Sequence, residues 1–104
     1  MLLTPENANS FIVEQKKRIR DDEENAEAHH ALSRAYMLKK ENQLAERHAR
    51  MATRLDPLNP AYYEQLGNTA FVLERYSEAL TELGTAIEID PERISAYLTL
   101  ARTY

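Results

Sequence analysis

Residues 56–91 read DPLNPAYYEQLGNTAFVLERYSEALTELGTAIEIDP, and the Asp-Pro pair that opens this stretch returns at its end, 34 residues later. The same offset aligns other positions by identity or by size, so the stretch is one unit of an internal repeat. A repeat at a fixed period of this length indicates a stack of similar structural units rather than a domain without internal repeats. The aligned sets are Leu32, Leu66 and Leu100; Ala45 and Ala79; Ala52 and Ala86; and Ser33, Gly67 and Ala101.

Apolar residues recur within each unit at steps of three, four and seven, as expected for an amphipathic helix. Two helices fit in each unit, and the Asp-Pro pairs end the second one because the residue before Pro avoids the α region. We expect a single domain over 1–104, with an N-terminal helix and linker over 1–25, repeat 1 over 26–59, repeat 2 over 60–93 and the first helix of repeat 3 over 94–104. The predicted helices lie near 26–39, 43–55, 60–73 and 77–89, and a further helix begins at Ile94.

The repeated positions resemble the tetratricopeptide repeat family over residues 26–104. The pattern places an aromatic residue or His before the repeated Leu, a small residue after it, Ala at two later positions and Pro at the end. This resemblance implies an all-α fold, in which antiparallel helix pairs stack as a right-handed α-solenoid of about 2.5 repeats. Residues that carry it include His29, Tyr63, Tyr97, Leu32, Leu66, Leu100, Pro57 and Pro91. Departures from the pattern are His29, where an aromatic residue is usual, and Lys40 and Glu74, where a turn Gly is common.

Residues 1–25 are less regular. Thr4 followed by Pro5 is typical of a helix N-cap with Pro at the first helical position, and an apolar stripe extends from there to Arg20. Gln15 and Arg18 fall at the 34-residue offsets of Ala49 and Ala52. This segment is therefore either a decayed repeat or a helix packed in a different register.

Composition limits the function. The chain has 104 residues, 43% of them apolar and 29% charged, with no Cys and a net charge of −4. We expect no nucleic-acid partner, because such binding depends on basic residues that contact phosphates. No apolar run is long enough to span a bilayer, so we expect no membrane contact by this segment. Charge is unevenly placed, at +2 over 26–59 and −5 over 60–93, which would favour head-to-tail attraction between copies.

No catalytic motif is present, and the two isolated glycines cannot form a phosphate-binding loop. His29 and His30 are adjacent and point about 100° apart on a helix, so they cannot chelate one ion together. We therefore expect no enzyme activity, no cofactor and no metal site.

A binding groove is the better candidate. In the expected stack the first helices of the repeats line a concave face, and Arg34, Asn68 and Arg102 form a polar row on it at the 34-residue offset. The resemblance implies that the Asn at 68 bonds the backbone of a bound peptide. The predicted peptide-binding residues are His30, Arg34, Met37, Glu64, Asn68, Phe71, Leu98 and Arg102. The plainer alternative is that these side chains form only a solvated inner surface and a partly buried helix edge.

One subgroup of the family clamps the C-terminal carboxylate of chaperone tails with two Lys, an Arg and two Asn. The matching positions here are His30, Arg34, Gln65, Ser95 and Thr99. The sequence therefore disfavours a chaperone-tail cochaperone and favours an adaptor or scaffold for another protein partner.

The rival hypothesis is a self-associating structural or assembly factor, such as the soluble portion of a bacterial cytochrome c or pilus biogenesis protein. The third repeat stops after its first helix, which leaves Tyr97, Leu100, Ala101 and Tyr104 without the helix that would cover them. We expect either a fragment of a longer repeat protein or a homodimer through this helix. A cytoplasmic location is expected, and the periplasmic soluble domain of an anchored protein stays open as the alternative.

Overall fold

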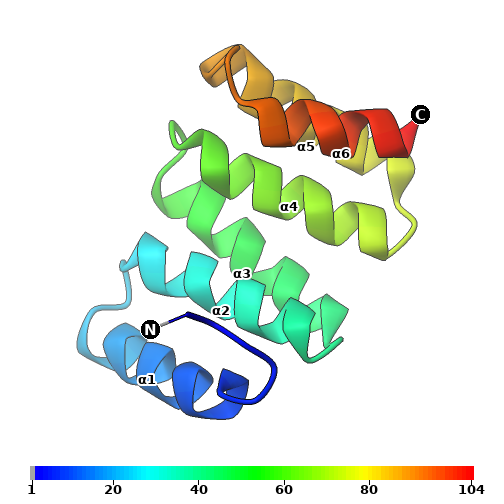
Figure 1. Ribbon diagram of the computed structural model, residues 1–104. Coiled ribbons are helices and arrows are strands. Elements are labelled where there is room, and N and C mark those ends of the chain that lie inside the picture. The colour runs from blue at the N-terminus through cyan, green and yellow to red at the C-terminus, as the bar shows by residue number, and fades with distance from the viewer. Residues whose placement is uncertain (1) are drawn as a thin grey trace.

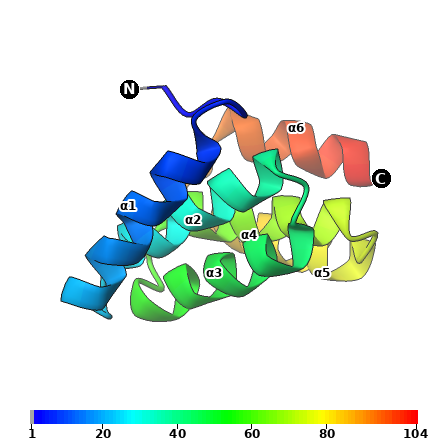
Figure 2. The same ribbon diagram turned by 90° about the horizontal axis from the view of Figure 1, so that it is seen from below.

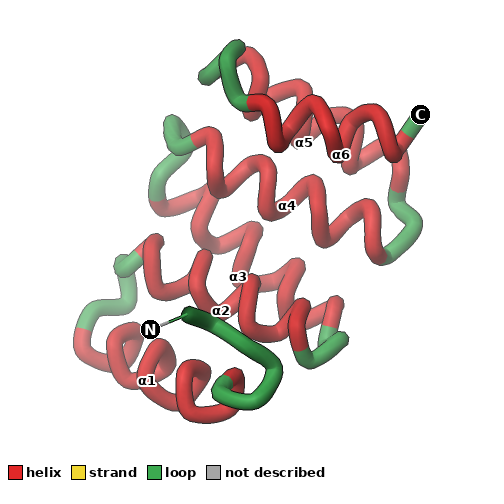
Figure 3. The backbone as a smooth tube through the Cα atoms, in the orientation of Figure 1, coloured by secondary structure: helices red, strands yellow, loops and turns green. Residues whose placement is uncertain are grey.

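The computed structural model describes residues 2–104, which form six helices and, within that range, no strand (Figures 1 and 3). The bounds predicted for four of these helices agree with the structure to within one residue at each end, and the last helix begins at Ile94 as expected. Because the repeat offset fixes where turn residues recur, it fixes the helix ends as well. The helices are α1 (Ala8–Asp21), α2 (Ala26–Leu38), α3 (Asn42–Leu55), α4 (Pro60–Val72), α5 (Tyr76–Ile89) and α6 (Ile94–Thr103).

Successive helices run antiparallel and pack on one another, α2 on α3, α3 on α4, α4 on α5 and α5 on α6. Figure 2 shows α2, α4 and α6 toward one side of the molecule and α3 and α5 toward the other. Contacts between α2 and α4 and between α4 and α6 complete the first of these layers. The result is an all-α helical solenoid, and we call the face formed by α2, α4 and α6 the inner face. No helix within residues 2–104 has the length and apolar character needed to cross a membrane.

Small residues let the paired helices approach closely. A Cβ added to Gly67 of α4 would lie 2.8 Å from Cγ of Leu83 on α5, closer than side-chain carbons approach one another. At the equivalent place in the first pair, the hydroxyl of Ser33 donates a 2.7 Å hydrogen bond to the carbonyl of Ala45. Both pairs therefore pack backbone against backbone at the same position of the repeat.

The two turns inside the helix pairs use residues other than Gly. Lys40 and Glu74 both adopt a φ of 62°, the left-handed conformation that Gly adopts at no steric cost. In each turn the N–H of the following residue bonds a carbonyl five residues back, Tyr36 in the first turn and Ala70 in the second. The positions at which the sequence departs from the usual turn Gly are thus turn positions with positive φ.

The start of α1 differs from the expectation. The amide of Thr4 donates to Oδ1 of Asn7 at 2.8 Å, while the amide of Asn7 approaches both the carbonyl and the hydroxyl of Thr4. These bonds close a separate turn over residues 4–7, so the helix begins at Ala8 and not at Pro5. The capping role of Thr4 toward residue 7 is present, and the predicted first helical position is wrong.

The bounds of α1 lie 34 residues before those of α3, so α1 stands in the place of the second helix of a preceding repeat. Its buried face nevertheless differs: Ala8, Ile12 and Gln15 are buried, whereas Arg18, at the offset of the fully buried Ala52, is exposed. An arginine cannot replace Ala in a close helix contact without burying its charge. The helix therefore keeps the repeat's position along the chain but turns a different face to α2.

Candidate functional site

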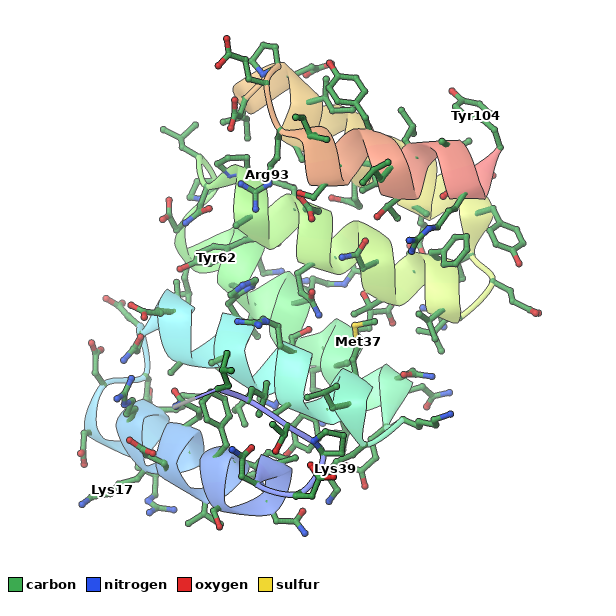
Figure 4. All side chains as sticks on the ribbon, in the orientation of Figure 1. Lys17, Met37, Lys39, Tyr62, Arg93 and Tyr104 are labelled. Carbon is green, nitrogen blue, oxygen red and sulfur yellow. The ribbon has the colours of Figure 1, made fainter. Side chains whose placement is uncertain are left out.

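The inner face is hollowed between α2 and α4, where side chains enclose an open pocket of about 350 Å³. Arg34 is exposed at this pocket and makes no ion pair within residues 2–104. Figure 4 shows Arg93, which lines the pocket, over the first turns of α4. The lining residues are His30, Arg34, Ala61, Glu64, Gln65, Asn68 and Arg93.

Two polar atoms at this pocket lack a partner. Nδ1 of His30 and Oδ1 of Asn68 are buried and form no hydrogen bond within the described residues, 2–104. Burial lowers the pKa of His30 to about 4, and the neighbouring charges of Arg34 and Arg93 act in the same direction. The imidazole is therefore neutral at pH 7 and lies against the ring of Tyr62, with the ring centres 4.9 Å apart. It can donate or accept one hydrogen bond, but it adds no positive charge to the site.

A second pocket of about 440 Å³ lies between α1 and α2 and shares His30 and Arg34 with the first. Gln15 of α1 lines it, and Oε1 of this otherwise buried side chain also has no partner. The hollow surface thus continues from α4 across α2 to α1. Sequence reasoning missed this extension because it placed the groove on the first helix of each repeat only; the polar Gln15 at the offset of buried Ala49 was the available signal.

Glu64 was predicted as a ligand-binding residue, and the structure gives its carboxylate two partners within the chain. Nε of Arg93 donates to Oε1 at 2.6 Å, and the hydroxyl of Ser95 donates to the same atom at 2.8 Å. The carboxylate therefore ties α4 to the beginning of α6 and neutralises Arg93. Arg34 is left as the uncompensated charge of the pocket.

The other four predicted residues lie outside this pocket. Met37 packs on the core formed by α1, α2 and α3, and its sulfur accepts a hydrogen bond from Nε2 of Gln65 on α4 at 3.0 Å. Phe71 packs on the core of the second helix pair with its ring edge-on to Tyr76. Leu98 and Arg102 are exposed on α6. The structure therefore brings together His30, Arg34, Glu64 and Asn68, and it places Met37, Phe71, Leu98 and Arg102 outside this pocket.

A histidine pair lies outside the pocket, in the contact between α2 and α3. Nδ1 of His29 and Nδ1 of His48 are 3.0 Å apart, and the ring of His48 also stacks on Tyr36. Burial lowers the pKa of both, to about 4 for His48, where the nearby charges of His29, Arg47 and Lys16 add to the effect. The sequence pattern does not reveal this contact, because residues 19 apart meet only through the geometry of the helix pair. No group of three potential metal ligands occurs among the described residues.

No family model matches the sequence, and no curated protein matches it. Solved structures do match. The tetratricopeptide repeat domain of Arabidopsis OM64 has a TM-score of 0.90 at 22% identity, over 94% of this chain and 81% of that domain. MamA has a TM-score of 0.87 at 27% identity, over 93% of this chain and 57% of that chain. The first tetratricopeptide repeat domain of Spaghetti (RPAP3), solved with the HSP90 peptide SRMEEVD, has a TM-score of 0.86 at 21% identity, over 94% of this chain and 85% of that chain.

These likenesses cover nearly the whole chain, and they agree with the 34-residue repeat that the sequence carries. The chain has the tetratricopeptide repeat fold.

Proposed function

We propose that this protein is a non-catalytic interaction scaffold whose inner face binds a peptide segment or helix of a partner protein. The observation that carries the proposal is the unpartnered polar group: His30 Nδ1 and Asn68 Oδ1 are buried without hydrogen bonds beside the free guanidinium of Arg34. A buried polar atom without a partner costs about 1–3 kcal/mol, so a ligand that supplies the missing bonds gains that energy on binding.

A polypeptide segment suits this chemistry. Its backbone offers an N–H to the amide oxygen of Asn68 and either an N–H or a carbonyl to the neutral imidazole of His30, after a modest rotation of either side chain. A carboxylate of the partner would pair with Arg34, since guanidinium groups bind carboxylates through two parallel hydrogen bonds. Arg102 on α6 extends the positive charge along the same face.

Two related structures support a protein partner as the class of ligand. The first tetratricopeptide domain of RPAP3 is described with an HSP90 peptide and the second with the HSP70 peptide SGPTIEEVD. The identity of those peptides does not carry over. The positions that clamp chaperone tails are His30, Arg34, Gln65, Ser95 and Thr99 here, and Gln65 already donates to Ser33 and Met37.

The test begins with capture of partners by the wild-type protein and their identification by mass spectrometry. Calorimetry then compares the wild type with the double variant Arg34→Glu, Arg102→Glu. We expect partner affinity to fall beyond detection, while helicity and the melting temperature stay nearly unchanged, because exposed substitutions shift stability by less than about 0.5 kcal/mol.

The matched control is Lys17→Glu with Arg20→Glu, the same change of charge on exposed positions of α1. This control should retain binding. Equal affinity of the wild type and the groove variant would remove Arg34 and Arg102 from the site, and equal losses in both double variants would reduce the effect to net charge.

Self-association is the second candidate, and the exposed apolar surface of α6 favours it. Ile94 is 72% exposed, Tyr104 89% and Tyr97 44%. Leu100, by contrast, packs on the core of the second helix pair, so a substitution there would disturb the fold. Sedimentation over a range of concentrations tests this candidate. A dimer that Ile94→Lys and Tyr104→Lys separate would support it, and a monomer at every concentration would exclude it.

A further inference from the structure

The outer side of α3 carries a second hollow, of about 400 Å³, that belongs to neither inner-face pocket. Three of its arginines share one side of α3, because Arg47, Arg50 and Arg54 are three and four residues apart. Arg75, at the beginning of α5, closes the other side. We call this region the arginine surface, and its lining consists of Gln43, Glu46, Arg47, Arg50, Met51, Arg54 and Arg75.

Two of the four arginines are held by acids. Nη1 of Arg75 donates to both carboxylate oxygens of Glu46, at 2.7 and 2.6 Å, and Arg50 lies 3.6 Å from the same carboxylate. Glu78 lies within 4.0 Å of both arginines. The side chain of Glu46 is only 14% exposed, so these contacts fix the floor of the hollow.

The other two arginines are free. Arg47 and Arg54 are exposed and form no ion pair among residues 2–104. They are seven residues apart on α3, which separates them by about 10 Å along the helix. The half-buried Met51 lies between them in sequence and lines the same hollow. The arginine surface thus presents two uncompensated cations on either side of an apolar, adaptable side chain.

We propose that the arginine surface is a second interaction site, which binds an acidic segment of a partner protein. The segment that fits carries two carboxylates about 10 Å apart, one for Arg47 and one for Arg54, with an apolar side chain between them for Met51. This spacing corresponds to two turns of an acidic amphipathic helix laid along α3. The proposal does not depend on the inner-face function, because α3 lies in the layer opposite α2 and α4 (Figure 2).

The surroundings favour a protein over a nucleic acid. A phosphate backbone needs an extended run of cations, whereas the free charge here covers two helical turns of a chain with a net charge of −4. No aromatic side chain lines the hollow to stack on a base. Met51 would be left unused by phosphates, but it would contact a Leu or Ile of an amphipathic segment.

The probe is a short synthetic helical peptide of Glu, Leu and Ala, in which two Glu lie seven residues apart with Leu between them. The control peptide has the same sequence with Gln in place of each Glu. Titration into isotopically labelled protein, followed by NMR, should shift the amide resonances of α3 and the first turn of α5. Binding should weaken with salt, and Arg47→Glu with Arg54→Glu should lower the affinity on the order of tenfold or more.

The control variant is again Lys17→Glu with Arg20→Glu, which should bind the acidic peptide as the wild type does. Shifts confined to α2 and α4, or equal binding of the Gln peptide, would overturn the proposal and leave the inner-face function untouched. Tighter binding of a duplex DNA oligonucleotide than of the peptide would also overturn it. The proposal would also be overturned if the wild-type protein self-associates and Arg47→Glu with Arg54→Glu abolishes this, because the arginine surface would then bind a second copy of the chain.

Discussion

The two complete helix pairs solve the same packing problem with different side chains. In α2 and α3 the facing positions are Ser33 and Ala49, and in α4 and α5 the residues at the same offset are Gly67 and Leu83. All four are buried. The smaller Gly67 faces the larger Leu83, whose Cγ lies 2.8 Å from where a Cβ would stand. The first pair thus combines two small residues at this contact, whereas the second combines a residue without a side chain with a larger one.

The polar groups differ between the pairs as well. The first pair holds the histidine contact between His29 and His48, and the residues at the same offsets in the second pair are Tyr63 and Glu82. Burial raises the pKa of Glu82, while it lowers the pKa of both histidines. The first pair also contains the buried bonds of Ser33 to Ala45 and Gln65. The second pair is thus held mainly by apolar packing, and the first depends in addition on neutral histidines and buried hydrogen bonds.

The largest loss of stability is expected from a substitution in the contact between α4 and α5. Leu83→Ala removes a fully buried side chain and should cost about 2–5 kcal/mol of unfolding free energy. If residues 67 and 83 compete for the same space, the smaller side chain in Leu83→Ala leaves room for a serine at 67. Gly67→Ser should then lower the free energy of unfolding less in the Leu83→Ala background than in the wild type, by at least about 1 kcal/mol. Denaturant unfolding of the wild type, the two single variants and the double variant measures this coupling. Strictly additive changes in unfolding free energy would show that the two positions do not compete for space.

The two glycines of the chain provide a sharper contrast. Gly67→Ala should destabilise the protein by about 1–3 kcal/mol, because the new Cβ collides with Leu83 and forces the helices apart. Gly84→Ala is the matched control: nothing lies within 4 Å of its added Cβ, so it should be neutral or stabilising by up to about 1 kcal/mol. Similar effects at both sites would show that helix propensity, and not close approach, decides the outcome.

Acid should distinguish the first pair from the second. The pKa of His48 is depressed from 6.5 to about 4 in the folded chain, so the unfolded chain takes up the proton first as the pH falls. Stability should therefore be full above pH 6.5 and decline between pH 6.5 and about 4. Because His30 contributes in the same window, the comparison requires His48→Phe and His30→Phe separately.

Each of these two variants should lose less unfolding free energy than the wild type between pH 6.5 and about 4, as measured by denaturant unfolding. A wild-type curve without any decline would contradict neutral burial of the histidines, and an unchanged slope in His48→Phe would exclude the contact with His29 as a cause.

The smallest effect concerns the turns, where the two pairs agree. Lys40→Gly and Glu74→Gly each relieve a positive φ of 62° on a residue with a Cβ, and each should stabilise the protein by up to about 1 kcal/mol. Thermal unfolding measures the gain. Loss of stability in both variants would mean that the entropy of Gly in the unfolded chain outweighs the relief of strain.

Sequence alone predicted the bounds of α2 to α5 because the 34-residue offset, the Asp-Pro pairs and Pro60 mark the same points in successive repeats. For α1 the departures at Gln15 and Arg18 left two alternatives open, a decayed repeat or a different register, and the sequence offered no second signal to choose between them. It named Glu64 for the site but could not foresee the bonds from Arg93 and Ser95, which join residues about 30 apart. The helix a residue belongs to follows from periodicity, whereas its hydrogen-bond partner depends on how neighbouring repeats stack.

Hydrogen exchange of the wild-type protein, measured with and without its captured partner, shows whether partners bind on the inner face. Binding on the inner face should slow exchange in α2 and α4 around His30, Arg34 and Asn68, protect α6 to a smaller degree and leave α5 unchanged. Protection confined to the exposed side of α6, or to α3 and α5 without α2 and α4, would contradict it.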